Sequence, residues 1–278
     1  DAEYKGLASG WDSFDQMSLI ERGCVTIIAA RPGGGKTDFS VNLVTRLALR
    51  FHVSYFTLEM TRPQLLNRIA SRITKINSNV IRTHQTTATQ KASVFKALEL
   101  MQAQLHLIID DKARLTIDEL ENKIIAQRPD VIFIDHVGLM QGSNPYTKKV
   151  EVLTEITGRL KEIAKKYNIA VVQLVQINRE QEKRKGAPTM ADLKGSGSFE
   201  EDCDSALFIC PEITPAKDSP ADEDYIQVQV RIAKNRNGPQ TTLYYCWQQQ
   251  FHAWQPLSYI YDDFKEVAQT PQQITFAG

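Results

Sequence analysis

The chain has 278 residues, of which 42% are hydrophobic and 24% are charged, a composition typical of an ordinary globular protein with a large buried core. Lysine and arginine together number 33, and so do aspartate and glutamate. Because these charges cancel, overall charge gives no argument for nucleic-acid binding, and any such affinity must come from local patches or from sites repeated in an oligomer.

The predicted elements alternate between strands and helices along most of the chain. Strand-like runs are found at Val25–Ala30, Val53–Thr57, Leu105–Ile109, Val131–Asp135, Ile169–Leu174 and Ala206–Cys210. Helical patterns separate most of them, which predicts an α/β fold with a mostly parallel sheet covered by helices. The runs Val131–Ile134 and Ala170–Val172 are apolar without alternation, so we expect these strands to be buried on both faces at the sheet centre.

Two helix starts are marked by the spacing of a capping box. Thr61 is followed three positions later by Gln64, and Thr116 by Glu119. In such a pair each side chain bonds to the backbone N–H of the other residue, which satisfies donors that the helix leaves unpaired. After the first pair, apolar residues recur at helical spacing, at Leu65, Leu66, Ile69 and Ile73.

After about Tyr225 the pattern changes to two hairpin-like strands. Tyr225–Ile232 and Thr241–Trp247 are joined by the turn-rich segment Asn235–Pro239, which predicts an antiparallel extension of the sheet.

Two segments and the C-terminal end carry no strand or helix pattern. Gly142–Lys149 and the acidic, proline-bearing segment Pro211–Asp224 are expected to be loops. Residues 257–278 have weak periodicity, so we expect one domain over residues 1–256 followed by a C-terminal tail.

The segment Ala30–Thr37 has the features of a phosphate-binding P-loop. It reads Ala-Arg-Pro-Gly-Gly-Gly-Lys-Thr, follows an apolar strand and precedes a helical pattern. Glycines let successive backbone N–H groups turn toward phosphates, and the helix that begins there offers unpaired donors and a positive dipole end. Lys36 is expected to reach the β- and γ-phosphates, and the Thr37 hydroxyl to hold Mg²⁺.

The residues expected to bind the nucleotide, ATP, are Arg31, Pro32, Gly33, Gly34, Gly35, Lys36, Thr37 and Asp38. Ala30 stands where the strict pattern has its first glycine, and an ordinary glycine turn is the alternative interpretation of the segment.

Three polar residues follow strands at the edge where open α/β sheets bind their ligands. Asp135 is expected to hold Mg²⁺ through water, with an ordinary turn aspartate as the alternative. Glu59 is expected to orient and deprotonate an attacking water, with a solvated glutamate near a helix start as the alternative. Gln176 is expected to sense the γ-phosphate, although its residue type alone does not separate it from a surface glutamine.

The cysteines and the apolar runs indicate a cytoplasmic protein. Cys24, Cys203, Cys210 and Cys246 form no C-x-x-C pair and lie in or beside apolar stretches, which favours packed, reduced thiols over a zinc site. No apolar run approaches the ~20 residues that span a bilayer, and the first residues lack the basic and apolar pattern of a signal peptide.

Seven motifs from about Gly6 to Trp254 stand in the order of one known family. They are Gly6–Asp15, Ala29–Thr37, Thr57–Met60, Ile134–Met140, Gln176–Glu180, Asp192–Asp202 and Ala233–Pro239. Together they resemble the ATPase domain of the DnaB-type replicative helicases, a branch of the RecA-like hexameric motors. Two positions depart from that family, which commonly has an acidic residue at Gly195 and an aromatic one at His136.

The resemblance implies a RecA-like P-loop NTPase fold and an ATP-hydrolysing DNA helicase. Six subunits would form a ring around single-stranded DNA, with ATP at each interface, and would move 5′ to 3′ and unwind duplex at a replication fork. The ring is expected when the helical N-terminal domain and linker helix of the family, which these residues do not include, are present. A primase and a helicase loader are the implied partners, in the cytoplasm of a bacterium or its phage.

By the same resemblance, Arg236 is the arginine finger and Lys234 its companion, and both reach the γ-phosphate on a neighbouring subunit. A cation supplied in trans neutralises charge on the phosphoryl oxygens and makes hydrolysis depend on assembly. In other NTPases such a cation raises the rate of hydrolysis by a factor of about 10³ to 10⁵. By composition alone, a hairpin turn with solvated cations is the alternative.

Two segments, 138–149 and 178–198, are the implied DNA-contacting loops. The second has a slight excess of basic over acidic residues and glycines that expose backbone N–H groups to phosphate. A solvated face is the usual role of such a charge run. The residues expected to contact DNA are Arg179, Lys183, Arg184, Lys194, Gly195 and Gly197.

Two other functions fit the same motifs. A RecA-type recombinase or a circadian-clock-like ATPase would use ATP on this fold without unwinding. A nucleotide-gated DNA-binding or loading module would leave the work to a partner. Unwinding of a forked duplex separates the first from a helicase, and DNA-stimulated ATP hydrolysis separates the second.

Overall fold

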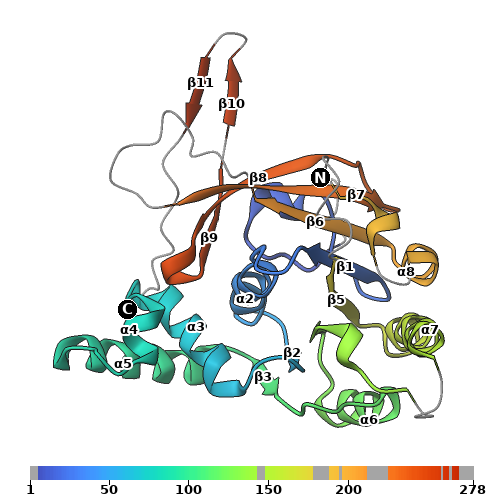
Figure 1. Cartoon of the computed structure of the whole chain (residues 1–278), viewed down its shortest axis with the longest axis horizontal. Helices are drawn as coiled ribbons and strands as arrows, with labels where there is room; N and C mark the ends of the chain where they lie inside the picture. Colours follow the sequence, from blue (N-terminus) through green and yellow to red (C-terminus); the bar gives the residue numbers. More distant parts are fainter. Residues whose placement is uncertain are drawn as a thin grey trace.

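In the described part of the chain, nine strands form one sheet in the order β3-β2-β4-β5-β1-β6-β7-β8-β9 (Figure 1). The computed structural model describes residues 6–142, 148–177, 188–193, 196–211, 225–257, 259–262 and 265–268. The strands are β1 (Val25–Ala30), β2 (Val53–Thr57), β3 (Leu107–Asp110), β4 (Val131–Asp135), β5 (Ala170–Gln176), β6 (Ser205–Pro211), β7 (Ile226–Asn235), β8 (Thr242–Gln248) and β9 (Ala253–Pro256).

The sheet is parallel from β3 to β6 and antiparallel from β6 to β9, which confirms the predicted fold class. β4 and β5 lie inside the parallel half, and all of β4 is buried. Their continuous apolar runs are explained by this place, because a central parallel strand is covered on both faces. The carboxyl ends of the parallel strands meet at one edge, whereas β7 ends at the opposite edge.

Helices cover both faces of the sheet. They are α1 (Asp12–Asp15), α2 (Lys36–Leu47), α3 (Arg62–Thr74), α4 (Ser78–Arg82), α5 (Ala88–Gln104), α6 (Ile117–Gln127), α7 (Lys149–Tyr167) and α8 (Ser196–Asp202). Buried side chains of α2, α3 and α5 form one cluster with Ile28 and Ala30 of β1, and those of α6, α7 and α8 form another with Val25, Ile27 and Ala29. Successive residues of β1 thus face opposite layers, as the pleat requires.

Both predicted capping boxes are present. The Thr61 N–H donates to Gln64 Oε1 at 2.9 Å at the start of α3. At the start of α6, the Thr116 N–H donates to Glu119 Oε2 at 3.2 Å, and the Glu119 N–H donates to Thr116 Oγ1 at 3.3 Å. These local bonds fix the two helix starts where the sequence predicts them.

The C-terminal part contains strands that the sequence pattern does not reveal. β9 pairs with β8, so that Trp254 lies opposite Trp247. β10 (Tyr259–Asp262) and β11 (Lys265–Ala268) form a separate two-stranded antiparallel sheet within the segment interpreted as a featureless tail. Each of these three strands has four residues, too few for a clear alternation of apolar and polar side chains.

Two further features bear on the expected class of protein. The four cysteines are free thiols, and Cys203 and Cys246 are buried. Among the helices of the described residues, none combines the length and the apolar character that crossing a membrane requires.

Candidate nucleotide-binding site

The P-loop connects β1 to α2 at the carboxyl edge of the parallel strands. Gly33 and Gly35 have φ angles of 72° and 85°, in the left-handed region that residues with a side chain rarely adopt. The Gly34 N–H donates to the Arg31 carbonyl at 2.9 Å, and α2 begins at Lys36. This is the glycine-dependent backbone of a phosphate cradle at the N-terminal end of a helix.

Two tryptophans of the antiparallel extension pack against Gly35. A Cβ atom at this position would stand 2.8 Å from Trp254 Cζ2 and 3.0 Å from Trp247 Cη2. The two indole rings are stacked with centroids 5.3 Å apart, and Phe39 of α2 lies 5.0 Å from Trp254. Gly35 is therefore required for this close contact as well as for the backbone conformation.

Asp135, at the end of β4, contacts Lys36 and Thr37 of the P-loop. Its carboxylate accepts a hydrogen bond from Lys36 Nζ at 2.8 Å and another from Thr37 Oγ1 at 2.7 Å. The Tyr55 hydroxyl donates to Asp135 Oδ2 at 3.0 Å and lies 2.9 Å from Ser40 Oγ. These contacts surround a side chain that is 1% exposed.

The surroundings of Asp135 favour its charged form. Burial acts to raise the pKa of the carboxyl, but the Lys36 ammonium and the hydrogen bonds from Thr37 and Tyr55 outweigh burial and hold that pKa below its usual value. Burial, and then the Asp135 charge, raise the pKa of Tyr55 well above its usual range. The tyrosine therefore keeps its proton and remains a donor.

Gln176 lies beside the start of the P-loop. It ends β5 in register with Ala30 of β1, and the Ile177 N–H donates to the Ala30 carbonyl at 3.0 Å. The amide is therefore one strand away from the loop that would hold the phosphates.

Glu59 reaches the same edge of the sheet. It follows β2, whose last residue, Thr57, is in register with Asp135, and it is exposed. Its negative charge acts on His136, the residue after Asp135. Burial and the Lys36 charge lower the pKa of His136 nonetheless, so the imidazole is neutral at neutral pH.

The Asp38 side chain has partners within the protein. Its carboxylate lies 2.5 Å from the Arg68 guanidinium of α3 and 2.9 Å from His252 Nδ1. The neighbouring Asn42 donates to the His252 carbonyl at 2.8 Å. The Asp38 carboxylate therefore ties α2 to α3 and to the turn before β9.

Lys234 and Arg236 lie at the opposite edge of the sheet from the P-loop of their own chain. Asn235 is in register with Ser205 of β6, which is in register with Thr26 near the amino end of β1. Ala30, where the P-loop begins, is four residues farther along β1, about 13 Å at the usual strand rise. The two cations therefore project from a different side of the subunit.

Of the residues predicted to contact DNA, one lies in the part of the chain that the structure describes. Gly197 is the second residue of α8 and is exposed, and a Cβ atom there would meet no atom within 4 Å. Arg179, Lys183, Arg184, Lys194 and Gly195 lie outside the described residues.

The predicted DNA loops contain more regular structure than the sequence suggests. Val137–Leu139 and Met190–Asp192 are 3₁₀ helices, and residues 196–198 belong to α8 rather than to a loop. The prediction of a loop through Ser198 is therefore wrong at its end. Glycine and serine disfavour a helix locally, but Phe199, 1% exposed in the cluster beneath α7, anchors this one by packing.

The residues around Asp135 suit a nucleotide with Mg²⁺. A carboxylate and a hydroxyl, held 2.7 Å apart, are the hard oxygen donors that Mg²⁺ prefers. Lys36 provides the neighbouring positive charge, and a Cβ atom at Gly34 would stand 3.0 Å from the Arg31 carbonyl. Glycine at positions 33–35 therefore leaves the loop backbone open to phosphate.

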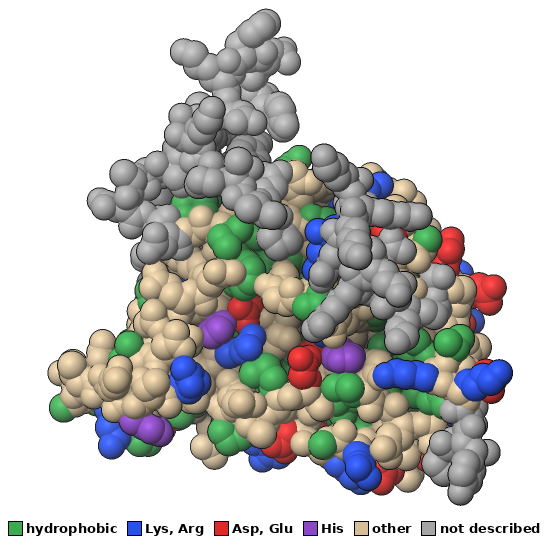
Figure 2. Space-filling view, in the orientation of Figure 1, with side chains coloured by type: hydrophobic (Ala, Val, Ile, Leu, Met, Phe, Trp, Pro, Cys, Tyr) green, Lys and Arg blue, Asp and Glu red, His purple; other side chains and the backbone are tan. Residues whose placement is uncertain are grey.

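Charged side chains are otherwise mixed over the surface. Figure 2 shows basic and acidic side chains interspersed over the face that it presents, in line with their equal totals. The face shown therefore carries charges of both signs rather than one.

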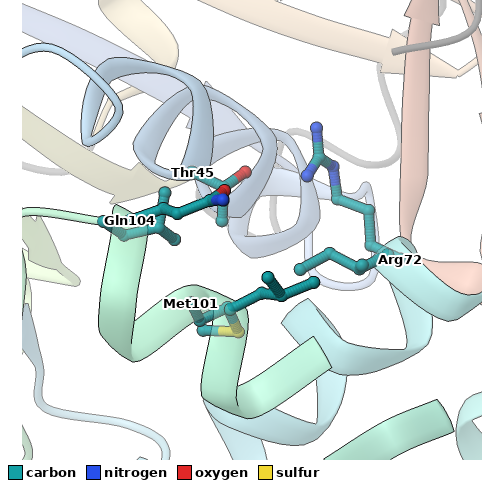
Figure 3. Close-up of a pocket in the computed structure, with 7 residues that line it drawn as sticks. Thr45, Arg72, Met101 and Gln104 are labelled. Carbon is teal, nitrogen blue, oxygen red and sulfur yellow. The ribbon is translucent and has the colours of Figure 1, made fainter. Parts of the chain in front are cut away.

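A pocket between α2, α3 and α5 is separate from the site. It is lined mainly by apolar groups, and Figure 3 shows Arg72 extending from α3 with its guanidinium turned away from Met101. Arg72 Nε donates instead to Asn42 Oδ1 at 2.6 Å. None of the predicted site residues lines this pocket, which we attribute to imperfect packing between the three helices.

The sequence pattern does not reveal Tyr55 and Ser40, which support Asp135, or Asp204, which contacts Arg236. For Tyr55 a signal exists, because residues two apart on a strand share a face and Tyr55 precedes Thr57 by two. For Asp204 the contact joins residues 32 apart in the chain, and no motif contains both.

Comparison with known proteins agrees with the geometry. A family profile described as "DnaB-like helicase C terminal domain" matches residues 6–256. The chain is 29% identical to a replicative DNA helicase DnaB of Geobacillus stearothermophilus, over 95% of this chain and 59% of that protein. It is 31% identical to the replicative DNA helicase DnaB of Pasteurella multocida, over 84% of this chain and 52% of that protein. The chain thus spans about half the length of the curated relatives it matches.

Solved structures share the fold. One described as an ATPase domain has a TM-score of 0.82 at 24% identity and covers 91% of this chain and 92% of its own. A second, described as a DnaB-like replicative helicase and its interactions with primase, has a TM-score of 0.80 at 24% identity, over 91% of this chain and 64% of its own. At this identity the likeness concerns the fold alone.

Proposed function

The chain belongs to the family of DnaB-like helicase C-terminal domains, and on this premise we propose that it is the motor of a replicative DNA helicase. It hydrolyses ATP, moves along single-stranded DNA and unwinds duplex at a replication fork. The observation that carries the proposal is the convergence of Lys36 and Thr37 on the buried Asp135 carboxylate at 2.8 and 2.7 Å. Phosphoryl transfer needs this combination of cation, hydroxyl and carboxylate beside a glycine cradle.

Each site residue then has one role. Backbone N–H groups of residues 33–35 and the Lys36 ammonium hold the phosphates, and Thr37 and Asp135 hold Mg²⁺, which neutralises phosphate charge when bound. Glu59, exposed at the same edge, orients and deprotonates the attacking water. Gln176, in register with Ala30, responds to the γ-phosphate.

Lys234 and Arg236 complete the site of a neighbouring subunit. Their distance from the P-loop of their own chain, across the length of β1, supports a role in trans. A ring in which each subunit lends these cations to the next couples hydrolysis to assembly. The ring encloses the strand, with Arg179, Lys183, Arg184, Lys194, Gly195 and Gly197 as its phosphate contacts.

The remaining parts of the proposal concern the setting. A primase and a helicase loader are the proposed protein partners, and the cytoplasm of a bacterium or phage-infected cell is the proposed location. Six copies are the proposed assembly for the protein that includes this motor.

ATP hydrolysis and unwinding by the assembled protein test the proposal. We expect turnover to rise with single-stranded DNA and a fluorescently labelled forked duplex to separate only with ATP. Glu59→Gln should lower kcat by about 10² or more, the usual contribution of a general base, with little change in nucleotide binding. Glu99→Gln, exposed on α5 and away from the site, is the matched control and should keep the original kcat.

Other outcomes would favour the alternatives. Strand exchange without fork unwinding indicates a recombinase, and ATP-dependent DNA binding without hydrolysis indicates a loading module. Full turnover in Glu59→Gln would remove that residue from the mechanism.

A further inference from the structure

Arg236 is held by its own chain at the C-terminal end of α8. Its Nη1 lies 3.3 Å from Asp204 Oδ1, and its Nη2 donates to the Glu201 carbonyl at 3.0 Å. The Arg236 N–H also donates to the Asp204 carbonyl at 2.9 Å. Lys234 Nζ donates to the Glu200 carbonyl. Both cations therefore meet carbonyl groups at the negative end of a helix, where positive charge is favoured.

The two carboxylate oxygens of Asp204 have different partners. Oδ2 accepts the Val25 N–H at 2.8 Å and also contacts Lys161 Nζ, whereas Oδ1 faces Arg236. Lys161 is 15% exposed and balances the charge of the carboxylate, which is 9% exposed. Arg236 is 49% exposed, so its longer contact adds little to stability and acts mainly on orientation.

We propose that Asp204 is a positioning residue for Arg236. Its Oδ1 atom and the Glu201 carbonyl hold the guanidinium in the orientation from which it approaches the nucleotide of the adjacent subunit. This inference rests on the proposed function, because it assumes that Arg236 acts in trans.

The physical basis is conformational freedom. An arginine side chain populates many rotamers in solvent. Hydrogen bonds to two fixed acceptors limit Arg236 to few rotamers before it contacts phosphate, so less conformational entropy is lost when that contact forms. Lys234 and Arg236 contact consecutive carbonyls of α8, so a displacement of α8 moves both cations together. α8 itself begins directly after residues 194–195, which are proposed to contact DNA.

Asp204→Asn is the informative variant, because the buried Val25 N–H and Lys161 both require an acceptor. The amide oxygen therefore takes the Oδ2 position, and the amide NH₂ group faces Arg236, where two donors cannot bond. We expect kcat of the assembled protein on single-stranded DNA to fall about 5- to 20-fold, with KM for ATP changed by less than about 2-fold. The residues proposed to bind ATP, the glycines, Lys36 and Thr37, are unchanged in this variant, so the affinity for ATP is spared.

Two comparisons separate positioning from damage to the fold. Lys161→Gln removes the other partner of the same carboxylate and should lower the Tm but leave kcat within about 2-fold. In an Arg236→Lys background, Asp204→Asn should have little further effect, because a single ammonium cannot make both contacts of the guanidinium.

The inference is overturned if Asp204→Asn raises kcat or leaves it unchanged. It is equally overturned if the loss is the same in the Arg236→Lys background, or if Lys161→Gln lowers kcat as much. In these cases the proposed motor would still be supported if single-stranded DNA stimulates ATP hydrolysis by the wild type and Arg236→Ala abolishes it. Full turnover in Arg236→Ala would instead refute the finger assignment and the inference with it.

Discussion

At the scale of single residues, the hydrogen-bond partners of the Asp135 carboxylate fix the geometry of the candidate site. The Asp135 carboxylate accepts hydrogen bonds from a lysine, a threonine and a tyrosine. Ser40 does not contact the carboxylate itself but hydrogen-bonds to the hydroxyl of that tyrosine, Tyr55. A buried carboxylate with this many donors stays ionised and keeps one orientation. Under the proposed function, its ability to hold Mg²⁺ would depend also on Tyr55 and Ser40, which are not among the proposed ligands.

Tyr55→Phe tests this dependence. The ring still fills its buried place, so only the hydroxyl contacts to Asp135 and Ser40 are lost, and the free energy of unfolding should fall by about 1–2 kcal/mol. The Mg²⁺ concentration that supports half-maximal binding of a fluorescent ATP analogue should rise about 3- to 10-fold. Ser40→Ala, which leaves the Tyr55–Asp135 bond in place, is the control and should change that concentration little. An equal rise in both variants would contradict the assigned role.

The sequence predicts the site residues whose pattern is local. Lys36, Thr37 and the glycines belong to one short motif, Asp135 is predicted because it ends a strand, and Glu59 because it closely follows one. Tyr55 and Asp204 are not found, since their roles depend on which strands and helices become neighbours. Asp38 belongs to the motif by position, yet its carboxylate is used by Arg68 and His252, which the chain brings from distant segments.

At the scale of elements, ion pairs fasten the helices that cover the second face of the sheet. Glu121 of α6 accepts hydrogen bonds from Arg159 and Lys166 at 2.8 and 2.9 Å and from the Tyr167 hydroxyl at 2.8 Å, all on α7. The bonds from Lys166 and Tyr167 contribute most to lowering the pKa of Glu121 to about 2. The ionised carboxylate is therefore favoured in the folded protein.

This shift predicts a pH dependence of stability. In the unfolded chain the pKa of a glutamate is about 4.3, so the stabilisation is complete above that pH and is lost as the pH falls toward about 2. The difference in Tm between wild type and Glu121→Gln should be largest above about pH 5 and should shrink steadily toward pH 2. Thermal unfolding monitored by circular dichroism measures it, with Glu99→Gln as the control. A difference that does not change with pH would show that the ion pairs do not cause it.

Element boundaries follow the sequence closely where burial and caps act together. β1, β2 and β4 have the predicted bounds, and each ends at or directly before a polar residue: Arg31, Thr57 and Asp135. The start of α8 is missed because the packing of Phe199 overrides the local preference of glycine and serine. β9 is missed because its role, pairing with β8, depends on a partner strand rather than on its own pattern.

For the whole molecule, the two halves of the proposed reaction centre lie at opposite edges of one sheet. Lys36 and Asp135 are at the carboxyl edge of the parallel strands, and Arg236 follows the end of β7 at the other edge. The overall fold could be predicted from the strand and helix alternation, whereas this separation requires knowing that β7 runs antiparallel to β6. Under the proposed function, a complete site would therefore need two copies of the chain.

Mixing two inactive variants tests this separation. Lys36→Ala removes the phosphate-binding cation and Arg236→Ala removes the finger, so each should be inactive alone. In assemblies formed from equal amounts, about a quarter of the interfaces pair an intact P-loop with an intact finger, so ATP turnover should partly recover. Steady-state hydrolysis across a series of mixing ratios measures the recovery, with unmixed proteins as controls. No recovery at any ratio, despite co-assembly, would mean that Arg236 serves its own subunit.

The packing around Gly35 also places tryptophan residues, which fluoresce, beside the P-loop. The chain has three tryptophans. Trp254 lies 5.3 Å from Trp247 and 6.0 Å from Tyr245, and Tyr245 lies 5.1 Å from Trp11, all as ring-centroid distances. Tryptophan emission from this chain therefore originates in one cluster of aromatic side chains, and Trp247 and Trp254 of this cluster pack against Gly35 of the P-loop. Nucleotide titrations can be followed by ultraviolet fluorescence without attaching a dye.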